Sequence, residues 1–129
     1  MKIENIEWLD IDEKEAVITV SNNYNKLICF SCPCDYQIGD ELTEQLECLD
    51  TIAVAVCDKC DSITKLESVF GYTLQGRIID AENGIVVVDD FVIHIDEKEI
   101  PGDVKDGMYI QFDTSRVDVW WSIFINLEW

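Results

Sequence analysis

The chain contains an internal duplication, and this feature constrains its architecture more than any local pattern does. Residues 8–54 reappear at residues 76–122 with a shift of 68 positions. Residues 11–20 align with residues 79–88 without a gap, and further along the same shift matches a proline, an aspartate, a glycine and a closing aliphatic residue. Because such a repeat describes one folding unit that occurs twice, the chain is expected to contain two similar modules in tandem.

The length of the chain, 129 residues, is that of one compact domain. A module of about 60 residues is only marginally stable alone, so the two modules are expected to pack together. We therefore expect a first repeat over residues 1–57, a connector over residues 58–70 and a second repeat over residues 71–129.

The charge balance is strongly acidic. Nine Lys and Arg residues stand against 27 Asp and Glu residues, which gives a net charge of −18. The hydrophobic content of 48% is nevertheless that of a folded protein and not of a disordered acidic tail. An acidic surface repels phosphate backbones and anionic lipid headgroups, so direct binding to nucleic acid or to membranes is disfavoured.

The first residues have no apolar segment like that of a secretion signal, and no apolar run approaches the roughly 20 residues that a membrane-spanning helix needs. These features predict a cytoplasmic protein. Its six cysteines are then expected to be free thiols or metal ligands, because disulfides rarely persist in that compartment.

Several short segments are rich in β-branched residues and end at turn residues, which is typical of strands. They are residues 16–20, 27–30, 52–56, 85–88 and 91–95. The pair Asn83-Gly84 predicts a tight turn, whereas the aligned pair Glu15-Ala16 lacks a glycine and predicts a different turn or a bulge. The first three strands of each repeat are expected to form a meander.

Residues 41–49 allow two interpretations. Leu42, Leu46 and Leu49 have helical spacing. The duplication aligns the start of this segment with residues 109–113, which alternate as a strand does. We therefore predict that residues 41–49 are extended.

The connector has the pattern of a short helix. Asp61 is a suitable N-cap, and Ile63, Leu66 and Phe70 lie on one helical face. A helix of one or two turns is expected within residues 58–70.

The C-terminal segment, residues 117–129, carries three of the four tryptophans of the chain. We expect a closing strand followed by a segment that packs the two repeats together. An exposed anchor for a partner protein is the alternative, because tryptophan is also favoured at binding hot spots.

The order of segments in the second half, residues 76–80, 84–88, 91–95 and 107–112, resembles that of cold-shock-type OB-fold barrels. The first half follows the same order more loosely. The resemblance implies a mainly β protein made of two tandem, five-stranded, barrel-like repeats packed together, with a short connector helix. It implies a fold only, because OB barrels host many functions.

Members of the cold-shock family that bind single strands use aromatic residues interleaved with Lys and Arg on strands two and three. The matching residues 85–96 contain no Lys or Arg. His94 matches the histidine of the family, but it lies beside Asp96 and Glu97. We interpret His94 as a surface or packing residue.

Two Cys-x-x-Cys pairs, Cys29 with Cys32 and Cys57 with Cys60, have spacing compatible with a four-thiolate zinc site. Neither pair is followed by the glycine of a zinc knuckle, and Cys29 aligns with a core position of the second repeat. Free cysteines are often simply buried. A structural zinc ion, redox chemistry and ordinary structural thiols are the alternatives.

The sequence has no catalytic signature. It contains no Gly-x-Ser-x-Gly and no phosphate-binding glycine loop, and one histidine does not make a histidine-based metal cluster. The acidic runs at residues 10–13 and 96–99 lack the ligand spacing of a calcium loop and are interpreted as solvated loops. An enzyme is not expected.

A folded acidic protein without catalytic groups is suited to docking onto a cationic partner. We predict an immunity- or antitoxin-like inhibitor that neutralises a basic protein such as a nuclease toxin. A zinc-stabilised tandem-barrel adaptor for protein–protein interaction and a nucleic-acid mimic are the alternatives. The predicted partner-binding residues are carboxylates in turns: Asp10, Asp12, Glu13, Asp40, Glu41, Asp89, Asp90, Asp96 and Glu97.

Overall fold

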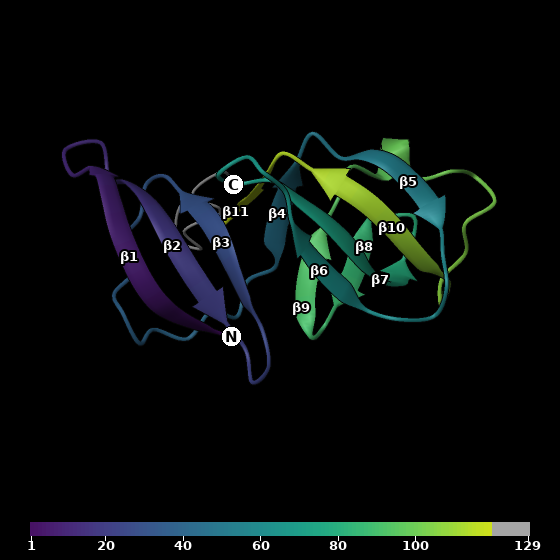
Figure 1. Cartoon of the computed structure of the whole chain (residues 1–129), viewed down its shortest axis with the longest axis horizontal. Coiled ribbons are helices and arrows are strands. Elements are labelled where there is room, and N and C mark those ends of the chain that lie inside the picture. The colour runs from purple at the N-terminus through teal and green to yellow at the C-terminus, as the bar shows by residue number, and fades with distance from the viewer. Residues whose placement is uncertain (120–129) are drawn as a thin grey trace.

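The computed structural model describes residues 1–119, which form an eleven-stranded sheet and one short 3-10 helix, η1 (Glu97–Glu99). The strands are β1 (Lys2–Asp10), β2 (Glu15–Ser21), β3 (Lys26–Ser31), β4 (Leu46–Leu49), β5 (Ile52–Val56), β6 (Ser62–Lys65), β7 (Tyr72–Asp80), β8 (Ile85–Val88), β9 (Phe91–His94), β10 (Tyr109–Thr114) and β11 (Arg116–Asp118). They form an elongated molecule with β1 near one end and β5 near the other (Figure 1). The predicted mainly β fold is confirmed.

The five segments predicted as strands coincide with β2, β3, β5, β8 and β9. The extended interpretation of residues 41–49 is also confirmed, because β4 lies there and Glu41 forms an isolated antiparallel bridge with Lys2. The predictions for Trp120, Trp121 and Trp129 concern residues outside the described part of the chain.

Each repeat begins with the predicted three-stranded antiparallel meander, β1-β2-β3 in the first and β7-β8-β9 in the second. In β2, Ala16, Ile18 and Val20 are fully buried, whereas the residues between them are only half-buried. This alternation is the two-residue period of a strand with one face on the core.

The hairpin turns of the two meanders are equivalent at a shift of 70 positions. Adding 70 to each residue number converts the pairing of β1 with β2, near the turn, into that of β7 with β8. Lys14, with φ of 58°, then matches Gly84, with φ of 72°. The prediction of a different first turn is wrong, because a gapless alignment at 68 displaced the two turns by two residues. The alternative of a bulge agrees with the register shift between Trp8 and Asp10, which the second hairpin repeats between Ile78 and Asp80.

Further along the chain, Gly39 and Gly107 are equivalent at the original shift of 68 positions. Gly39 and Gly107 have φ of 95° and 93°. Each glycine N–H donates to the carbonyl of a strand isoleucine, Ile3 (2.8 Å) or Ile78 (2.7 Å). The N–H of that isoleucine donates in turn to the carbonyl of the residue after the glycine, at 2.9 and 2.8 Å. The same clamp therefore attaches the later part of each repeat to its first strand.

The two repeats exchange short strands. β4 follows the first meander but pairs in parallel with β9, and β11 follows the second meander but pairs in parallel with β3. β4 and β11 are antiparallel to each other. The pairing path β1-β2-β3-β11-β4-β9-β8-β7-β10-β5 is therefore continuous, and it does not confirm two separate five-stranded barrels.

The connector contains a strand where a helix was predicted. β6 pairs antiparallel with β7, so that Ile63 lies opposite Leu74. Asp61 caps no helix, because its carboxylate accepts a hydrogen bond from the Asp89 N–H at 3.0 Å. The helix prediction for residues 58–70 is wrong, since a one- or two-turn helix forms few internal hydrogen bonds and pairing with β7 satisfies the backbone better.

The buried side chains form one core that both repeats share. Its largest fully buried members are Phe91, Phe112, Ile3, Ile18, Leu27, Leu46, Leu74, Ile78, Ile93, Ile95, Ile110 and Val20. The Phe30 ring of the first repeat also packs against the Phe70 ring of the connector, with ring centroids 6.1 Å apart in an edge-to-face arrangement. The shared core explains how two modules of marginal size are stable together.

Candidate functional site

The structure divides the nine predicted partner-binding carboxylates among three places. The first group lies at the turn between β1 and β2, the second around a pocket near the N-terminus, and the third beside His94. The groups are Asp10, Asp12 and Glu13; Asp40, Glu41, Asp89 and Asp90; and Asp96 and Glu97. The predicted residues therefore do not form one continuous face.

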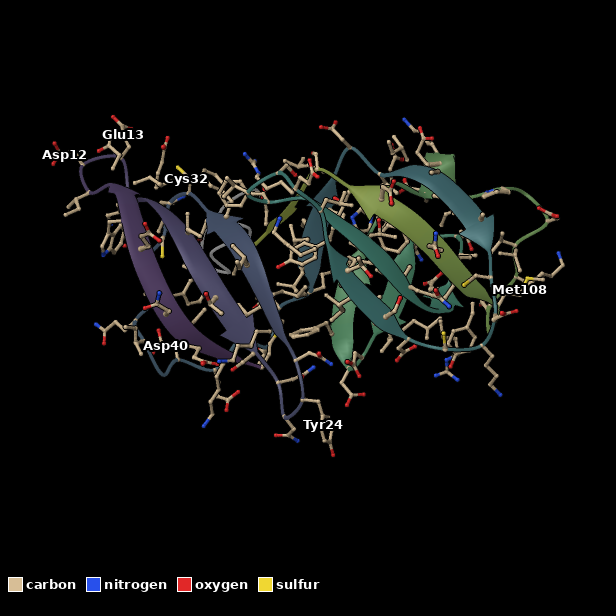
Figure 2. All side chains as sticks on the ribbon, viewed as in Figure 1. Asp12, Glu13, Tyr24, Cys32, Asp40 and Met108 are labelled. Carbon is tan, nitrogen blue, oxygen red and sulfur yellow. The ribbon has the colours of Figure 1, made fainter. Side chains whose placement is uncertain are left out.

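The first group lies at the tip of the β1–β2 hairpin. One carboxylate oxygen of Asp10 accepts hydrogen bonds from the backbone N–H groups of Asp12 (3.0 Å) and Glu13 (3.2 Å). These bonds order the turn, as aspartate commonly does at this position of a turn. Figure 2 shows Asp12 and Glu13 pointing outward at the extreme end of the molecule.

Three apolar side chains lie among these carboxylates. Trp8, Leu9 and Ile11 are 42%, 54% and 71% exposed. All four of the last residues of β1 are exposed, so this end of the hairpin extends beyond the core. We call Trp8, Leu9 and Ile11, together with Asp10, Asp12 and Glu13, the hairpin tip.

Sequence reasoning selected the carboxylates of the hairpin tip but not its apolar members. The signal was present in Trp8, Leu9 and Ile11, apolar residues that interrupt an acidic run, on a strand whose partner β2 carries the buried positions. It was not recognised because apolar residues within a strand are usually assigned to a core.

The only cation within the tip turn is already paired. The Lys14 ammonium lies 2.5 Å from a carboxylate oxygen of Asp35. In the described chain, no ion pair involves the side chains of Asp10, Asp12 or Glu13. The hairpin tip therefore presents three unpaired negative charges next to an exposed apolar surface.

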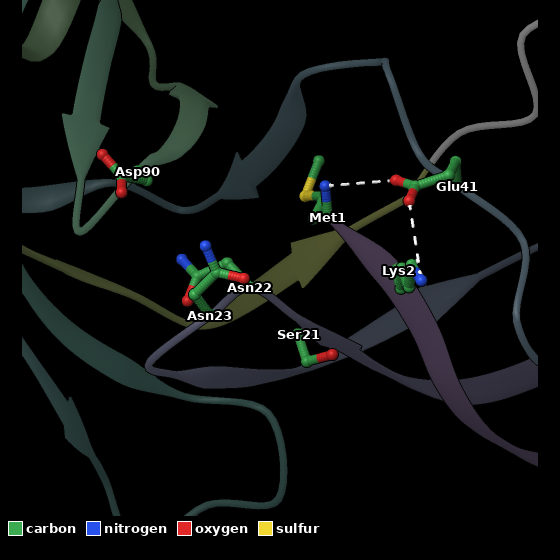
Figure 3. Close-up of a pocket in the computed structure, with 7 residues that line it drawn as sticks. All are labelled: Met1, Lys2, Ser21, Asn22, Asn23, Glu41 and Asp90. Carbon is green, nitrogen blue, oxygen red and sulfur yellow. Dashed lines mark ion pairs between the residues drawn. The ribbon is translucent and has the colours of Figure 1, made fainter.

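Two members of the second group, Glu41 and Asp90, line a pocket of about 340 Å³ between the N-terminus and two hairpin turns (Figure 3). The Glu41 carboxylate forms ion pairs with the N-terminal ammonium of Met1, at 3.7 Å, and with the side-chain ammonium of Lys2, at 3.9 Å. Asp90 lies on the opposite side, beside Asn22 and Asn23. The charge of Glu41 is thus engaged within the protein.

Asp89 and Asp90 form the two-residue turn between β8 and β9, with φ of 50° and 71°. The Asn22 side-chain amide donates to the carbonyl of Asp89 at 2.5 Å. This contact joins the β2–β3 loop of the first repeat to the β8–β9 turn of the second. Asp89 therefore has a structural role that the sequence did not indicate.

The third group surrounds the histidine. His94 Nδ1 lies 2.6 Å from Glu47 on β4, and His94 Nε2 lies 3.5 Å from Glu97. Asp96 accepts a hydrogen bond from the Lys98 N–H and caps η1. Because β4 and β9 come from different repeats, His94 connects the two modules, and Asp96 and Glu97 are occupied by local contacts.

The cysteines do not assemble into a metal site. Within residues 1–119, no three Cys, His, Asp or Glu side chains are close enough together to hold a metal ion. Cys29 is buried in β3, whereas Cys57 and Cys60 lie between β5 and β6 near the other end of the molecule. The structure therefore does not bring together the four thiols of the predicted zinc site.

Burial also makes several thiols poor nucleophiles. The pKa of the Cys29 thiol is raised well above its ordinary value by desolvation, and desolvation raises the pKa of Cys48 to about 12. The pKa of Cys57 is raised by desolvation and by the neighbouring Cys60 and Asp58. Since the thiolate is the reactive form, the raised pKa values lower the reactivity of these three thiols at neutral pH, and Cys29 is placed to pack in the core.

The exposed Cys32 gives a direct check on this electrostatic environment. Its pKa is raised by partial desolvation and by the carboxylates of Glu15 and Glu13. At pH 8 we therefore expect Cys32 to react more slowly with iodoacetamide than N-acetylcysteine does, and the variant Glu15→Gln to react faster than the wild type. Peptide-resolved mass spectrometry measures both rates. Equal rates for Cys32 and N-acetylcysteine would contradict the raised pKa.

Comparison with protein-family models, curated proteins and solved structures finds no match. Among the described residues, no helix has the length and apolarity needed to cross a membrane.

Proposed function

We propose that this protein is a non-enzymatic binding protein of the cytoplasm that inhibits a basic protein partner, in the manner of an immunity protein or antitoxin acting on a nuclease toxin. The observation that carries the proposal is the hairpin tip, where exposed Trp8, Leu9 and Ile11 lie among the carboxylates of Asp10, Asp12 and Glu13.

This combination matches the anatomy of a protein interface. Tryptophan is enriched among residues that contribute most to binding, and such residues are surrounded by a polar rim that excludes water. The three carboxylates supply a rim of one sign, which attracts a basic surface over a distance of about one Debye length. The net charge of −18 adds a long-range field that accelerates encounter with a cationic protein.

Three of the other six predicted carboxylates are less suited to this role. Glu41 is paired with the N-terminus, Asp96 caps η1 and Glu97 lies against His94. The separation of the three groups also gives no support to the alternative of a nucleic-acid mimic, which needs carboxylates spaced along one face. The zinc-stabilised adaptor has no support from the positions of the cysteines.

Reversing the charge of the hairpin tip is expected to slow association. The double variant Asp12→Lys and Glu13→Lys should reduce the association rate with the basic partner by about tenfold or more at low salt, because the long-range attraction is lost. The wild-type chain is used to capture partners from lysate, and binding of each purified partner is followed by surface plasmon resonance at low and high salt.

The matched control is Glu99→Lys with Asp103→Lys, two exposed residues of the second repeat that undergo the same change of charge. This control should retain most of the association rate, since its positions are outside the hairpin tip. Capture of neutral partners alone, with association insensitive to salt, would contradict the proposal.

Removing the aromatic side chain of Trp8 should act on the dissociation rate of the complex. Trp8→Ala is expected to raise the dissociation rate about tenfold or more while the association rate changes little, because buried aromatic contacts hold a formed complex together. Circular dichroism establishes that the variant is folded, as expected for a side chain that is 42% exposed. An unchanged dissociation rate would exclude Trp8 from the interface.

A further inference from the structure

Strand β1 lies at one end of the pairing path, and most of its outer edge is unpaired. Among the described residues its only strand partner is β2, and Figure 1 shows β1 near the end of the molecule. The start of the edge is covered, because Ile3 bonds to the backbone of Gly39 and Asp40. Over residues 4–9, no described residue forms a backbone hydrogen bond with this outer edge. We call this stretch the β1 edge.

The register of β1 on β2 shows which backbone groups lie on the β1 edge. In an antiparallel pair, alternate residues direct their N–H and C=O groups toward the partner strand and away from it. Ile3 directs both groups outward. The β2 residues opposite Ile3, Ile6 and Trp8 are alternate ones: Val20, Ile18 and Ala16. Ile6 and Trp8 therefore share the outward orientation of Ile3, and their N–H and C=O groups are free to bond to another strand.

The two faces of the β1 edge differ in chemistry. Ile6 and Trp8 lie on the same face as the fully buried Ala16 and Ile18, and Ile6 packs against the core. Glu7 lies on the opposite face and is exposed. Within residues 1–119, no ion pair involves Glu7. A strand along this edge would contact an apolar surface on one face and an unpaired negative charge on the other.

The strand at the other end of the pairing path, β5, lacks these properties. Ala53 has φ of 57°, and the register of β5 on β10 shifts between residues 111 and 113, which marks a bulge. Bulges protect an edge against pairing with another strand. β5 also has no charged residue. On β1, in contrast, residues 5–8 pair with β2 without interruption.

We propose that the β1 edge binds an extended, basic segment of the partner protein as an additional strand. The backbone of the segment bonds to Ile6 and Trp8, its apolar side chains cover these two residues, and its Lys or Arg side chains lie on the face of Glu7. The segment therefore alternates apolar and basic residues. The net charge of −18 attracts such a segment. The inference rests on the proposed function, because it specifies how the basic partner is recognised beside the hairpin tip.

Short peptides test the β1 edge without the partner protein. The probe is acetyl-KVKVKVK-amide, and its controls are the isomer acetyl-KKKKVVV-amide and the probe methylated at each valine amide nitrogen. The valines lie opposite Ile6 and Trp8, so their N–H groups are the ones that bond to β1. Isothermal titration calorimetry of the full chain should show binding of the probe and about tenfold weaker binding of both controls. Equal binding of the isomer, which has the same charge, would overturn the proposal.

Hydrogen exchange locates the bound strand residue by residue. In the free chain, the amides of Ile6 and Trp8 should exchange rapidly, whereas the amide of Glu7 faces β2 and should be protected. Saturation with the probe should slow exchange of Ile6 and Trp8 about tenfold or more and leave Glu7 unchanged. Slow exchange of Ile6 and Trp8 in the free chain, or dimerisation through β1, would show that the chain itself covers this edge and would refute the proposal.

A matched pair of variants tests the charge on the β1 edge. Glu7→Lys should weaken binding of the probe about fivefold, because like charges then lie side by side on adjacent strands. Glu99→Lys, the same change at an exposed residue outside β1, should leave binding nearly unchanged. Equal weakening by the two variants would assign the attraction to net charge alone and contradict the proposal. If the probe does not bind but the whole partner does, the edge pairing is wrong and the proposed function stands.

Discussion

Replacing Leu46 with alanine is expected to lower the free energy of unfolding by about 2–5 kcal/mol, the cost of a cavity in a well-packed core. Leu46 is fully buried on β4, the strand that leaves the first repeat and pairs with β9 of the second, where Leu46 lies opposite Ile93. Its side chain is part of the core that both repeats share. The loss should therefore destabilise the whole molecule and not one module.

Urea unfolding measures the loss of stability in Leu46→Ala, and hydrogen exchange of the folded protein shows which strands lose protection. Amides of β2 in the first repeat and β8 in the second should lose protection together, because the exchanged strands make the repeats one cooperative unit. Leu49→Ala on the same strand is the control, since Leu49 is 39% exposed and alanine keeps the backbone carbonyl to which the Thr114 and Ser115 hydroxyls donate. Loss of protection in one repeat alone would show that the modules fold independently.

Replacing Gly84 with alanine is the second change with a large expected effect. A Cβ at Gly84 would lie 2.3 Å from the carbonyl oxygen of Ile95, and the residue has φ of 72°. We expect a loss of about 2–4 kcal/mol, from the left-handed conformation and from overlap with backbone that cannot rotate away.

The equivalent position in the first repeat provides a matched control. Lys14 has nearly the same backbone conformation but a side chain that reaches Asp35 at the surface. Lys14→Gly should change the free energy of unfolding by less than about 1 kcal/mol, because relief of the left-handed conformation offsets the loss of an exposed ion pair. Thermal and urea unfolding of both variants measure the difference. Similar effects at the two positions would contradict the role assigned to Ile95.

Local patterns in the sequence were sufficient for most of the strands and turns. The β-branched runs of β2, β8 and β9 and the glycines Gly39 and Gly107 carry their conformational preferences within a few residues. The connector was mispredicted because Ile63, Leu66 and Phe70 have a spacing that fits a short helix. Its extended conformation depends on pairing with β7, a strand that the local pattern does not contain.

The hairpin tip was only partly predictable for the same reason. Asp10, Asp12 and Glu13 were recognised from their charge and their position in a turn. The exposure of Trp8 and Ile11 depends on how far the hairpin extends beyond the core, which the two residues do not encode.

The amino-acid order thus specified a duplicated, acidic, mainly β chain, since alternation, turn residues and net charge are properties of neighbouring residues or of simple counts. The exchange of β4 and β11 and the shared core arose only in the folded molecule. Folding also determined which carboxylates keep a free charge and which of them pair with a cation. These features depend on contacts between residues far apart in the chain, and such contacts are chosen by the packing of the whole core.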